Sequence, residues 1–556
     1  MTMVTAGELL IRTLARAGVE KLFALHGAHL ETLFQACIDN DIAVLDTRHE
    51  VAAGHAAEAY ARTARKLGVA MITAGPGFTN VITSMANAWL DRTPVLYLAG
   101  SAALRDAETN TLQAGIDQVA IARPITKWAQ QITTADQLPR LVAEAVRITT
   151  GAPTGPVLLD LPIDILTTML DEDSVPLPDN LLLDSPPAPT AELMDQAINL
   201  LNRAERPVMM IGGDVWASHG EQELIKFVEQ TGIPVYSDFA GHGVLPSSHP
   251  LYGGTFHKMA DLEEPHRPDV ILILGTRLGL FTLGGTDILI PKRARLIHID
   301  VDAKELGKLR PVALPVAAGS REALRALNQI ARETQWPDFS AWQSLIMETK
   351  QKRRARFADA AARKKPPIHP YQAVSTIIES LPRNTVIIGD GAESYHWLNE
   401  VIAQEQGGGY LTHGFLGAVG FGLGLALGAA WAHPGRPVLC IAGDGAVGFT
   451  LIEFDTMVRH KLPIVVVVMN NSSWGASQHF QEIVSGKDRL LGTQLSTTRY
   501  HDVAAGFGCY AEEVTELEQL APALQKAFAS GTPACINVII DQEPLPPEVG
   551  LLMQRH

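Results

Sequence analysis

Short apolar runs alternate with longer amphipathic stretches along most of this chain. The first such runs read as buried strands, and the amphipathic stretches between them read as helices; the strands fall at residues 21–25, 42–46, 69–73, 94–99 and 157–161. Strands that alternate with helices predict a parallel, doubly wound α/β sheet. The pattern recurs with strands at residues 208–211, 235–237, 270–274 and 296–301, and again in the last third of the chain. We therefore expect three doubly wound parallel-sheet domains.

Two stretches interrupt this alternation. Residues 170–189 are rich in Pro and Asp and read as a surface linker, while residues 350–365 are rich in Lys and Arg and predict a solvated helix, which Pro366 and Pro367 end. These breaks predict an N-terminal domain over 1–168, a middle domain over 190–335 and a C-terminal domain over 366–545. The first and third share one plan.

The C-terminal domain contains a crossover with polar residues at both strand ends. An apolar run at 437–442 precedes Gly443-Asp444-Gly445, a helix is predicted at 449–460, and a second apolar run at 463–469 precedes Asn470-Asn471. A right-handed crossover brings Asp444 and Asn471 to the same carboxyl edge, where open α/β folds bind ligands. Such glycines let backbone N–H groups approach an anion, and these oxygens suit Mg²⁺. Gly-Asp-Gly alone also makes ordinary turns.

The N-terminal domain offers polar residues at corresponding places. Glu50 begins a helical run after a strand, although an acid there also complements the helix dipole. The glycine-rich segment 73–80 joins a strand to a helix, and His26 and His29 follow the first strand. Structural imidazoles are the alternative for the histidines, and a solvent-facing side chain is the alternative for Gln113.

The composition of the chain limits the kinds of molecule it can bind and the compartment in which we expect it. The 556 residues are 46% hydrophobic and 19% charged, with a formal net charge of −15, which argues against nucleic acid or an anionic membrane. The four cysteines are scattered without metal-binding spacing and read as buried thiols in a reducing compartment. The start lacks the apolar core of a signal peptide, and no apolar run approaches the roughly 18 residues of a membrane span. We expect a cytoplasmic protein.

The run GDGAVGFTLIEFDTMVRHKLPIVVVVMNN at 443–471 resembles the motif of thiamine-diphosphate-dependent enzymes. The resemblance implies that Mg²⁺ is held by Asp444, Asn471 and the backbone carbonyl of Ser473, and that it clamps the diphosphate. It also implies that Glu50 protonates N1′ of the aminopyrimidine and so starts the relay that activates the thiazolium carbon C2. Further expected cofactor contacts are Gly75, Asn80, Gly417, Val419, Gly443 and Gly445.

Within the family, runs such as LHGAH at 25–29, TLQAGIDQVA at 111–120 and SWGASQHF at 473–480 resemble the benzaldehyde lyase branch. That resemblance implies a lyase and carboligase that cleaves 2-hydroxy ketones to aldehydes and forms them again. It implies a homo-oligomer, dimer or tetramer, whose cofactor lies between the first domain of one subunit and the third of another. His29 and Gln113 join Glu50 as expected catalytic residues. The expected substrate pocket comprises Ala28, Leu112, Ile163, Tyr395, His413, Trp474, Ala476 and Phe480.

Several residues differ from the pattern of that branch, so other functions stay open. Ile163 stands where the branch has a tryptophan, and Val419 is small for the wedge that bends the cofactor. An acetolactate-synthase-like enzyme or a 2-keto-acid decarboxylase is the first alternative, against which the chain has His26-Gly27-Ala28 in place of a Pro-Gly-Gly turn. A catalytically silent thiamine-binding protein is the second, against which Glu50 is intact. The middle domain lacks a GxGxxG after its first strand, so we expect no FAD.

Overall fold

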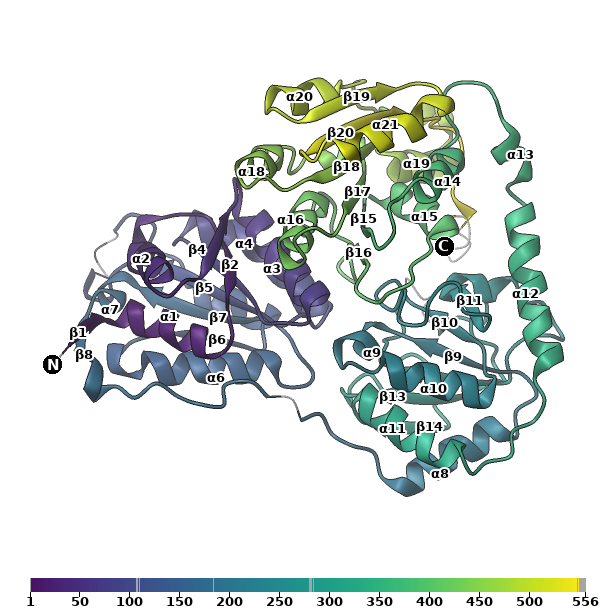
Figure 1. Ribbon diagram of the computed structural model, residues 1–556, viewed down its shortest axis with the longest axis horizontal. Helices are drawn as coiled ribbons and strands as arrows, with labels where there is room; N and C mark the ends of the chain where they lie inside the picture. The colour runs from purple at the N-terminus through teal and green to yellow at the C-terminus, as the bar shows by residue number, and fades with distance from the viewer. Residues whose placement is uncertain are drawn as a thin grey trace.

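The structure is a computed structural model that describes residues 2–106, 109, 111–183, 185–279, 283, 285–547 and 549. It contains three six-stranded parallel sheets, each flanked by helices, which confirms the predicted fold class (Figure 1). The exact limits of the three domains stay a prediction. Among the described residues, no helix is both long enough and apolar enough to cross a membrane.

The first sheet has the strand order β3-β2-β4-β5-β7-β6. Its strands are β2 (Lys21–Ala24), β3 (Ala43–Asp46), β4 (Gly68–Ile72), β5 (Val95–Ser101), β6 (Trp128–Gln131) and β7 (Val157–Pro162). Its helices are α1 (Ala6–Arg16), α2 (Glu31–Asp39), α3 (Glu50–Ala64), α4 (Pro76–Leu90), α5 (Gln118–Ala122), α6 (Leu138–Thr150) and α7 (Ile163–Leu166). A small antiparallel pair, β1 (Met3–Thr5) with β8 (Met169–Asp171), ties the ends of this domain together.

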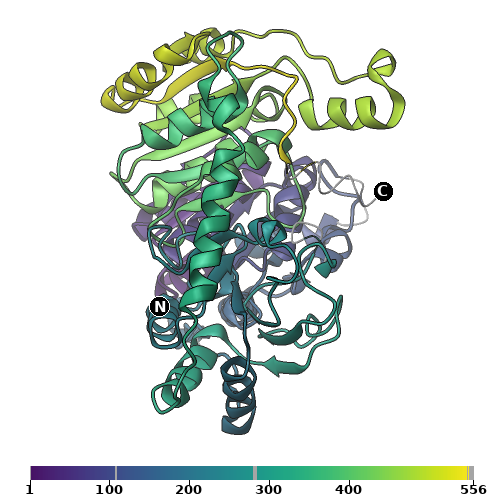
Figure 2. The same cartoon turned by 90° about the vertical axis from the view of Figure 1, so that its right-hand side faces the viewer.

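The middle sheet has the order β11-β10-β9-β12-β13-β14. Its strands are β9 (Pro207–Ile211), β10 (Val235–Ser237), β11 (Tyr252–Thr255), β12 (Val270–Leu274), β13 (Arg295–Asp300) and β14 (Leu314–Ala317). Its helices are α8 (Ala191–Asn202), α9 (Gly213–Ala217), α10 (Glu221–Thr231) and α11 (Ser320–Ala331). The connector helices α12 (Ser340–Ala355) and α13 (Ala358–Ala362) then lead along the outside of the molecule to the third domain (Figures 1 and 2).

The third sheet has the order β16-β15-β17-β18-β20-β19. Its strands are β15 (Val386–Asp390), β16 (Tyr410–Thr412), β17 (Val438–Gly443), β18 (Ile464–Asn470), β19 (Tyr510–Val514) and β20 (Ala534–Ile539). Its helices are α14 (Pro370–Glu379), α15 (Ala392–Val401), α16 (Gly422–Ala432), α17 (Asp444–Val447), α18 (Glu453–Arg459), α19 (Gly475–Ser485), α20 (Tyr500–Gly506) and α21 (Leu517–Ala529). Strand β17 pairs in parallel with β18 along its whole length, as the crossover predicts.

Two sequence predictions need correction. The helix predicted at 449–460 is α18 and begins only at Glu453, because the preceding segment crosses a glycine turn, where the Thr450 hydroxyl donates to the carbonyl of Gly420 at 2.8 Å. The basic stretch is not simply a solvated helix: Arg353 is buried and pairs with Asp261 and Glu400. The four cysteines are buried free thiols, as expected.

Helices α3 and α16 join the first domain to the third (Figure 1). A Cβ atom at Gly428 would lie 2.0 Å from the backbone oxygen of Ala56, so only glycine allows this approach. One hydrophobic core runs across both domains, including Phe23 and Tyr97 on one side and Phe421 and Phe454 on the other. The backbone N–H of Arg48 also donates to the carboxylate of Glu453. The first and third domains are therefore packed against each other within one chain.

Candidate active site

A cavity of about 130 Å³ opens at the carboxyl edge of the third sheet, beside β17 and β18. Asp444 and Asn471, which follow these two strands, both line it, as the crossover predicts. Its lining includes eight residues expected at the site, Val419, Gly443, Asp444, Gly445, Asn471, Ser473, Trp474 and Ala476. At Gly445 a Cβ atom would lie 2.7 Å from the Trp474 ring, so glycine is required for this loop to pack beneath the tryptophan.

Asp444 has the properties of a cation ligand. Its side chain is buried, and its Oδ2 atom has no hydrogen-bond partner among the described residues. Burial raises the pKa of this carboxyl to about 6. The Oδ1 atom of Asn471 accepts from the backbone N–H of Ser473 at 3.2 Å, which orders the turn after β18. A buried carboxylate oxygen without a partner is what a bound cation would satisfy, so these residues fit a Mg²⁺ and diphosphate site.

Asp390, at the end of β15, orders the glycine-rich turn that carries Gly417 and Val419. Its two carboxylate oxygens accept from the backbone N–H groups of Gly420, at 3.0 Å, and of Gly422, at 2.8 Å. Gly417 and Gly420 both have positive φ. The side chain of Val419 stands partly exposed, in the lining of the cavity. Sequence reasoning missed Asp390, whose signal is a carboxylate at a strand end, the same as that of Asp444.

A second acidic side chain, also missed, lines the cavity. Glu393, in the first turn of α15, hydrogen-bonds through Oε1 to Nδ1 of His479 on α19. This hydrogen bond raises the pKa of His479. A Cβ atom at Gly475 would lie 2.2 Å from Oε2 of Glu393, so the glycine leaves room for this carboxylate. The pair fixes α19 against α15 beside the Asp444 loop.

Glu50 begins α3 at the carboxyl edge of the first sheet, and its side chain is mostly buried. The Asn80 amide donates to Oε2 of Glu50 at 3.0 Å. Gly77 lies against the other oxygen, since a Cβ there would be 3.4 Å from Oε1. Gly75, with φ of +63°, is the residue before α4, and its N–H donates to Gln118. The glycine-rich turn therefore surrounds the Glu50 carboxylate.

His29 and Gln113 lie on the same edge. Nδ1 of His29 is 3.3 Å from the hydroxyl of Thr73, and the methyl of Thr73 lies 2.8 Å from the position of a Cβ at Gly77. Gln113, with positive φ, packs over Gly75, whose Cβ position is 3.1 Å from Cβ of Gln113. Partial burial lowers the pKa of His29. The structure thus groups His29, Glu50, Asn80 and Gln113 around Thr73 and Gly75.

The two groups do not meet in one cavity within a single chain. The cavity beside Asp444 is lined only by residues of 370–540, and Glu50, Gly75 and Asn80 are not among them. Ala28, Leu112 and Phe480 are exposed, and Ile163 is half-buried. Tyr395 and His413 are buried, with ring centroids 4.6 Å apart, and lie outside the lining of that cavity. The roles of these residues stay predictions.

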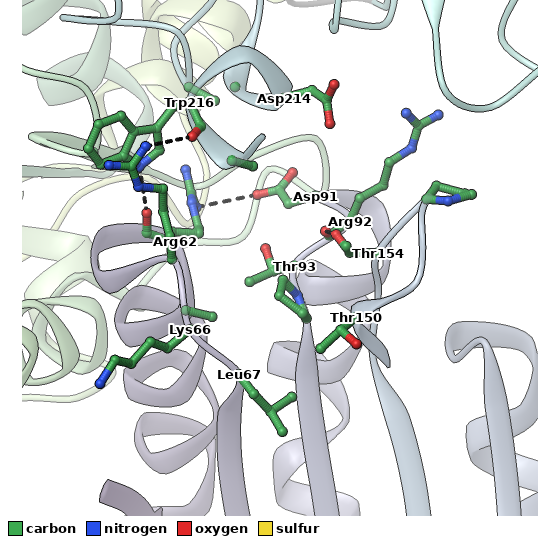
Figure 3. Close-up of a pocket in the computed structure, with 18 of the residues that line it drawn as sticks. Arg62, Lys66, Leu67, Asp91, Arg92, Thr93, Thr150, Thr154, Asp214 and Trp216 are labelled. Carbon is green, nitrogen blue, oxygen red and sulfur yellow. Dashed lines mark hydrogen bonds and ion pairs between the residues drawn. The ribbon is translucent and has the colours of Figure 1, made fainter. Parts of the chain in front are cut away.

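A larger cavity, of about 610 Å³, lies elsewhere, where the first domain, the carboxyl edge of the middle sheet and residues 408–415 of the third domain meet (Figure 3). Arg92, from the first domain, donates to Asp300 at 2.8 Å and to Asp302 at 3.3 Å. The guanidinium of Arg65 lies 3.6 Å from the ring centroid of Trp216. Ion pairs between the first domain and the middle domain therefore fill part of the carboxyl edge of the middle sheet. The expectation that the middle domain binds no FAD stays a prediction.

Comparison with known families identifies three successive matches. Residues 4–121 match the N-terminal TPP-binding domain of thiamine pyrophosphate enzymes, residues 194–327 their central domain and residues 390–538 their C-terminal TPP-binding domain. The central match contains every strand of the middle sheet, and the other two matches contain most of the strands of the first and third sheets.

Relatives that match most of the chain support the same family. The chain is 32% identical over 538 residues to a probable acetolactate synthase of Mycobacterium bovis, covering 96% of each chain. It is 30% identical over 584 residues to human 2-hydroxyacyl-CoA lyase 2, covering 96% of this chain and 90% of the human one. These names do not support the benzaldehyde lyase branch specifically. The chain belongs to the family of thiamine pyrophosphate enzymes.

Proposed function

We propose that this protein is a thiamine-diphosphate-dependent lyase and carboligase that cleaves 2-hydroxy ketones to aldehydes and forms them again. The observation that carries the proposal is the grouping of His29 with Glu50 on the edge of the first sheet. Cleavage of a 2-hydroxy ketone requires a base for the substrate hydroxyl, whereas decarboxylation of a 2-keto acid does not. Because its pKa is lowered, His29 is neutral near pH 7 and can accept that proton.

Asp444, Asn471 and the carbonyl of Ser473 would hold Mg²⁺ and, through it, the diphosphate. When bound, thiamine diphosphate supplies an acidic carbon, C2, whose conjugate base attacks carbonyl groups and stabilises the charge left on the attacked carbon. Glu50, oriented by Asn80, would hold a proton at N1′ of the aminopyrimidine. His29 would take the proton from the substrate hydroxyl as the carbon–carbon bond breaks, and a proton would then be delivered to the former carbonyl carbon, which leaves as the second aldehyde, so that one turnover gains and loses no proton.

The separation of the two groups supports a homo-oligomeric enzyme. The Asp444 cavity lacks every first-domain residue expected at the cofactor, so the proposed site needs Glu50 from a second copy. A mixing experiment tests this arrangement. Glu50→Gln and Asp444→Ala proteins, each inactive, should regain activity when unfolded and refolded together, because a mixed dimer contains one site with both residues intact.

An acetolactate-synthase-like enzyme, which takes a 2-keto acid as donor, is the second candidate. The name of the Mycobacterium bovis relative favours it over benzaldehyde lyase. Against it, no Lys or Arg is among the described third-domain residues that line the Asp444 cavity, so this half of the proposed site offers a substrate carboxylate no cationic side chain. The human relative named 2-hydroxyacyl-CoA lyase 2 is compatible with lyase chemistry.

A substrate panel separates the candidates. Purified protein with thiamine diphosphate and Mg²⁺ is given benzoin, acetoin and short aldehydes in parallel with pyruvate and benzoylformate, and products are followed by chromatography. We expect aldehydes from the hydroxy ketones and coupling of the aldehydes. Because Ile163 replaces an aromatic residue, aliphatic acyloins should be accepted beside benzoin. Rapid release of CO₂ from the keto acids, with the other compounds unchanged, would instead establish the second candidate.

A further inference from the structure

Gln118 is a buried polar side chain of the first domain, outside the residues that the proposed reaction uses. It is the first residue of the short helix α5 and lies in the same loop as Gln113. The carboxylate of Asp117 accepts from the backbone N–H of Ala120 at 2.8 Å, which fixes the start of this helix. Burying an amide destabilises a fold unless its polar atoms are paired. The partners of Gln118 therefore show which parts of the fold it holds together.

The amide of Gln118 joins the ends of three neighbouring strands. Its Oε1 atom accepts from the backbone N–H of Gly75, after β4, at 2.9 Å. Its Nε2 atom donates to the carbonyl of Gly100, in β5, at 3.0 Å and to Oδ2 of Asp160, in β7, at 3.4 Å. Strands β4, β5 and β7 are adjacent in the first sheet. Because a backbone N–H only donates and a carbonyl only accepts, these contacts fix the orientation of the amide.

The two glycines that Gln118 binds, Gly75 and Gly100, also contact two residues expected to be catalytic. A Cβ atom at Gly75 would lie 3.1 Å from Cβ of Gln113. A Cβ atom at Gly100 would lie 2.8 Å from Cβ of His29. Each glycine thus lets one of these residues pack closely against the sheet edge. Since the Gln118 amide is planar and bonded to both glycines, it sets the separation between them.

The backbone of Gln113 has an unfavourable conformation. Its φ of +62° lies in the left-handed region, which residues with a Cβ atom adopt uncommonly and which recurs at functional sites. Such a conformation persists only where the surrounding contacts hold it. The loop from Gln113 to Gln118 contacts Gly75 at both ends, by packing at the first residue and by a hydrogen bond at the last. Loss of the hydrogen bond should therefore let Gln113 move.

We infer that Gln118 is a positioning residue, which sets the placement of His29 relative to Gln113 through its hydrogen bonds to the strand ends that they contact. The inference rests on the proposed function, because that reaction needs His29 at the substrate hydroxyl. Since the side chain of Gln118 is buried, it acts through these residues and does not contact the substrate. Displacing a catalytic group by about 1 Å can lower a rate about 10²-fold, so a buried amide can control turnover.

The first test is Gln118→Leu in the holoenzyme, saturated with thiamine diphosphate and Mg²⁺. Leucine is of similar size and removes all three hydrogen bonds. We expect kcat for benzoin cleavage, per folded chain, to fall about tenfold or more. Exchange of the C2 proton should fall less, because Glu50 keeps its hydrogen bond from Asn80. Gln35→Leu, at an exposed position of the same domain, is the control and should leave both rates unchanged. An unchanged kcat in Gln118→Leu, or equal losses in kcat and exchange, would overturn the inference.

Gln118→Glu, which keeps the shape of the side chain, tests the same bonds by pH. A carboxylate there accepts from Gly75 but cannot donate to Gly100, whereas a protonated carboxyl can do both. Burial and the nearby carboxyls of Asp160 and Asp117 should raise the pKa of a carboxyl at this position. The ratio of kcat in this variant to kcat in the parent should therefore rise as the pH falls from about 8 to about 5. A constant ratio would contradict the inference, since a role in stability alone gives no recovery of turnover in acid.

Hydrogen exchange separates this inference from the proposed function. The amide hydrogen of Gly75, which Gln118 binds, should exchange faster in Gln118→Leu than in the parent, as read by mass spectrometry of peptides that cover residues 73–80. This measurement needs no substrate. A parent that cleaves no 2-hydroxy ketone would contradict the proposed function. Unchanged exchange at Gly75 would instead contradict the role of Gln118, whichever substrate the enzyme takes.

Discussion

The amide of Asn80, in the second turn of α4, donates a hydrogen bond at 3.0 Å to the carboxylate of Glu50, the first residue of α3. Both residues follow strands of the first sheet, so the sheet edge sets their separation. The contact leaves Oε1 of Glu50 beside Gly77, which has no side chain of its own to cover this oxygen. Asn80 thus orients the acid on which the proposed proton relay depends.

Replacing Asn80 should disturb the orientation of Glu50 more than cofactor binding. We expect Asn80→Ala to lower kcat about tenfold or more, the cost of losing a hydrogen bond to a charged group, with a smaller change in thiamine diphosphate affinity. Steady-state kinetics and calorimetry measure the two effects. Thr79→Ala, at the neighbouring exposed position, is the control. Equal losses in both variants would remove the positioning role of Asn80.

Glu50→Gln keeps the shape of the side chain and removes its acid. General acid–base steps contribute about 10²–10⁴ in rate, so exchange of the C2 proton of bound thiamine diphosphate for deuterium should slow by that range. Cofactor affinity should change far less. Quenched exchange read by NMR gives the rate, and exchange as fast as in the parent would show that Glu50 is not part of the relay.

Asp444→Ala removes the buried carboxylate proposed to bind Mg²⁺. Without it the repulsion between metal-free diphosphate and the site is unscreened, and we expect at least about tenfold weaker binding of thiamine diphosphate. Calorimetry at fixed Mg²⁺ concentration measures this affinity. Asp488→Ala, in an exposed 3₁₀ turn of the same domain, is the control. An unchanged affinity in Asp444→Ala would place the metal elsewhere.

His413 should make stability depend on pH. Burial lowers its pKa to about 4, while the unfolded chain has a value near 6.5, so the unfolded state binds more protons between these values. The contribution of the neutral, buried ring is therefore complete above about pH 6.5 and is lost as the pH falls towards 4. From the pKa difference, this loss is about 3 kcal/mol.

The comparison is between the parent and His413→Gln, by denaturant unfolding at pH 7 and pH 4. The parent should lose more free energy of unfolding on acidification than the variant. Buried carboxyls such as Asp390, whose pKa is raised to about 6, have the opposite effect but are present in both proteins. The same loss in parent and variant would be inconsistent with a neutral, buried His413.

Gly428 tests the contact between the first and third domains. Gly428→Val places a side chain against the backbone oxygen of Ala56, and such overpacking costs about 1–3 kcal/mol or separates the two helices. We expect a lower thermal midpoint. Gly506→Ala, in a helix with open space around it, should be neutral or stabilising by up to about 1 kcal/mol. A neutral Gly428→Val would mean that α3 and α16 do not pack as described.

The spacing of apolar residues and the polar residues that follow the strands were enough to predict the three sheets. They also predicted that Asp444 and Asn471 lie at the same sheet edge. The buried strands of parallel sheets are continuous apolar runs, so β17 and β18 are unambiguous in sequence. Edge strands such as β6 and β14 were missed, since Trp128–Gln131 is short and half polar, and Leu314–Ala317 is short, contains a proline and has every second residue exposed. The helix predicted at 449–460 was too long because apolar residues continue through the turn that precedes Glu453. That turn is held by the hydrogen bond from Thr450 to Gly420, which is distant in sequence.

The sequence patterns also did not predict contacts between segments that are far apart in the chain. The Glu393–His479 pair and the Asp390 hydrogen bonds each join two stretches that no local pattern relates. In sequence the basic run of α12 resembles a solvated face, although Arg353 on this helix pairs with Asp261 of the middle domain and Glu400 of the third. Such sites depend on how domains are stacked, which periodicity does not encode.

The proposed lyase differs from the second candidate in taking a 2-hydroxy ketone in preference to a 2-keto acid. One competition measures it: holoenzyme is given equal concentrations of benzoin labelled with ¹³C at its carbonyl carbon and pyruvate labelled at its carboxyl carbon, and the reaction is followed by ¹³C NMR. We expect labelled benzaldehyde, or an acyloin newly formed from it, to appear before labelled CO₂ or bicarbonate. Labelled CO₂ appearing first, with benzoin unchanged, would contradict it.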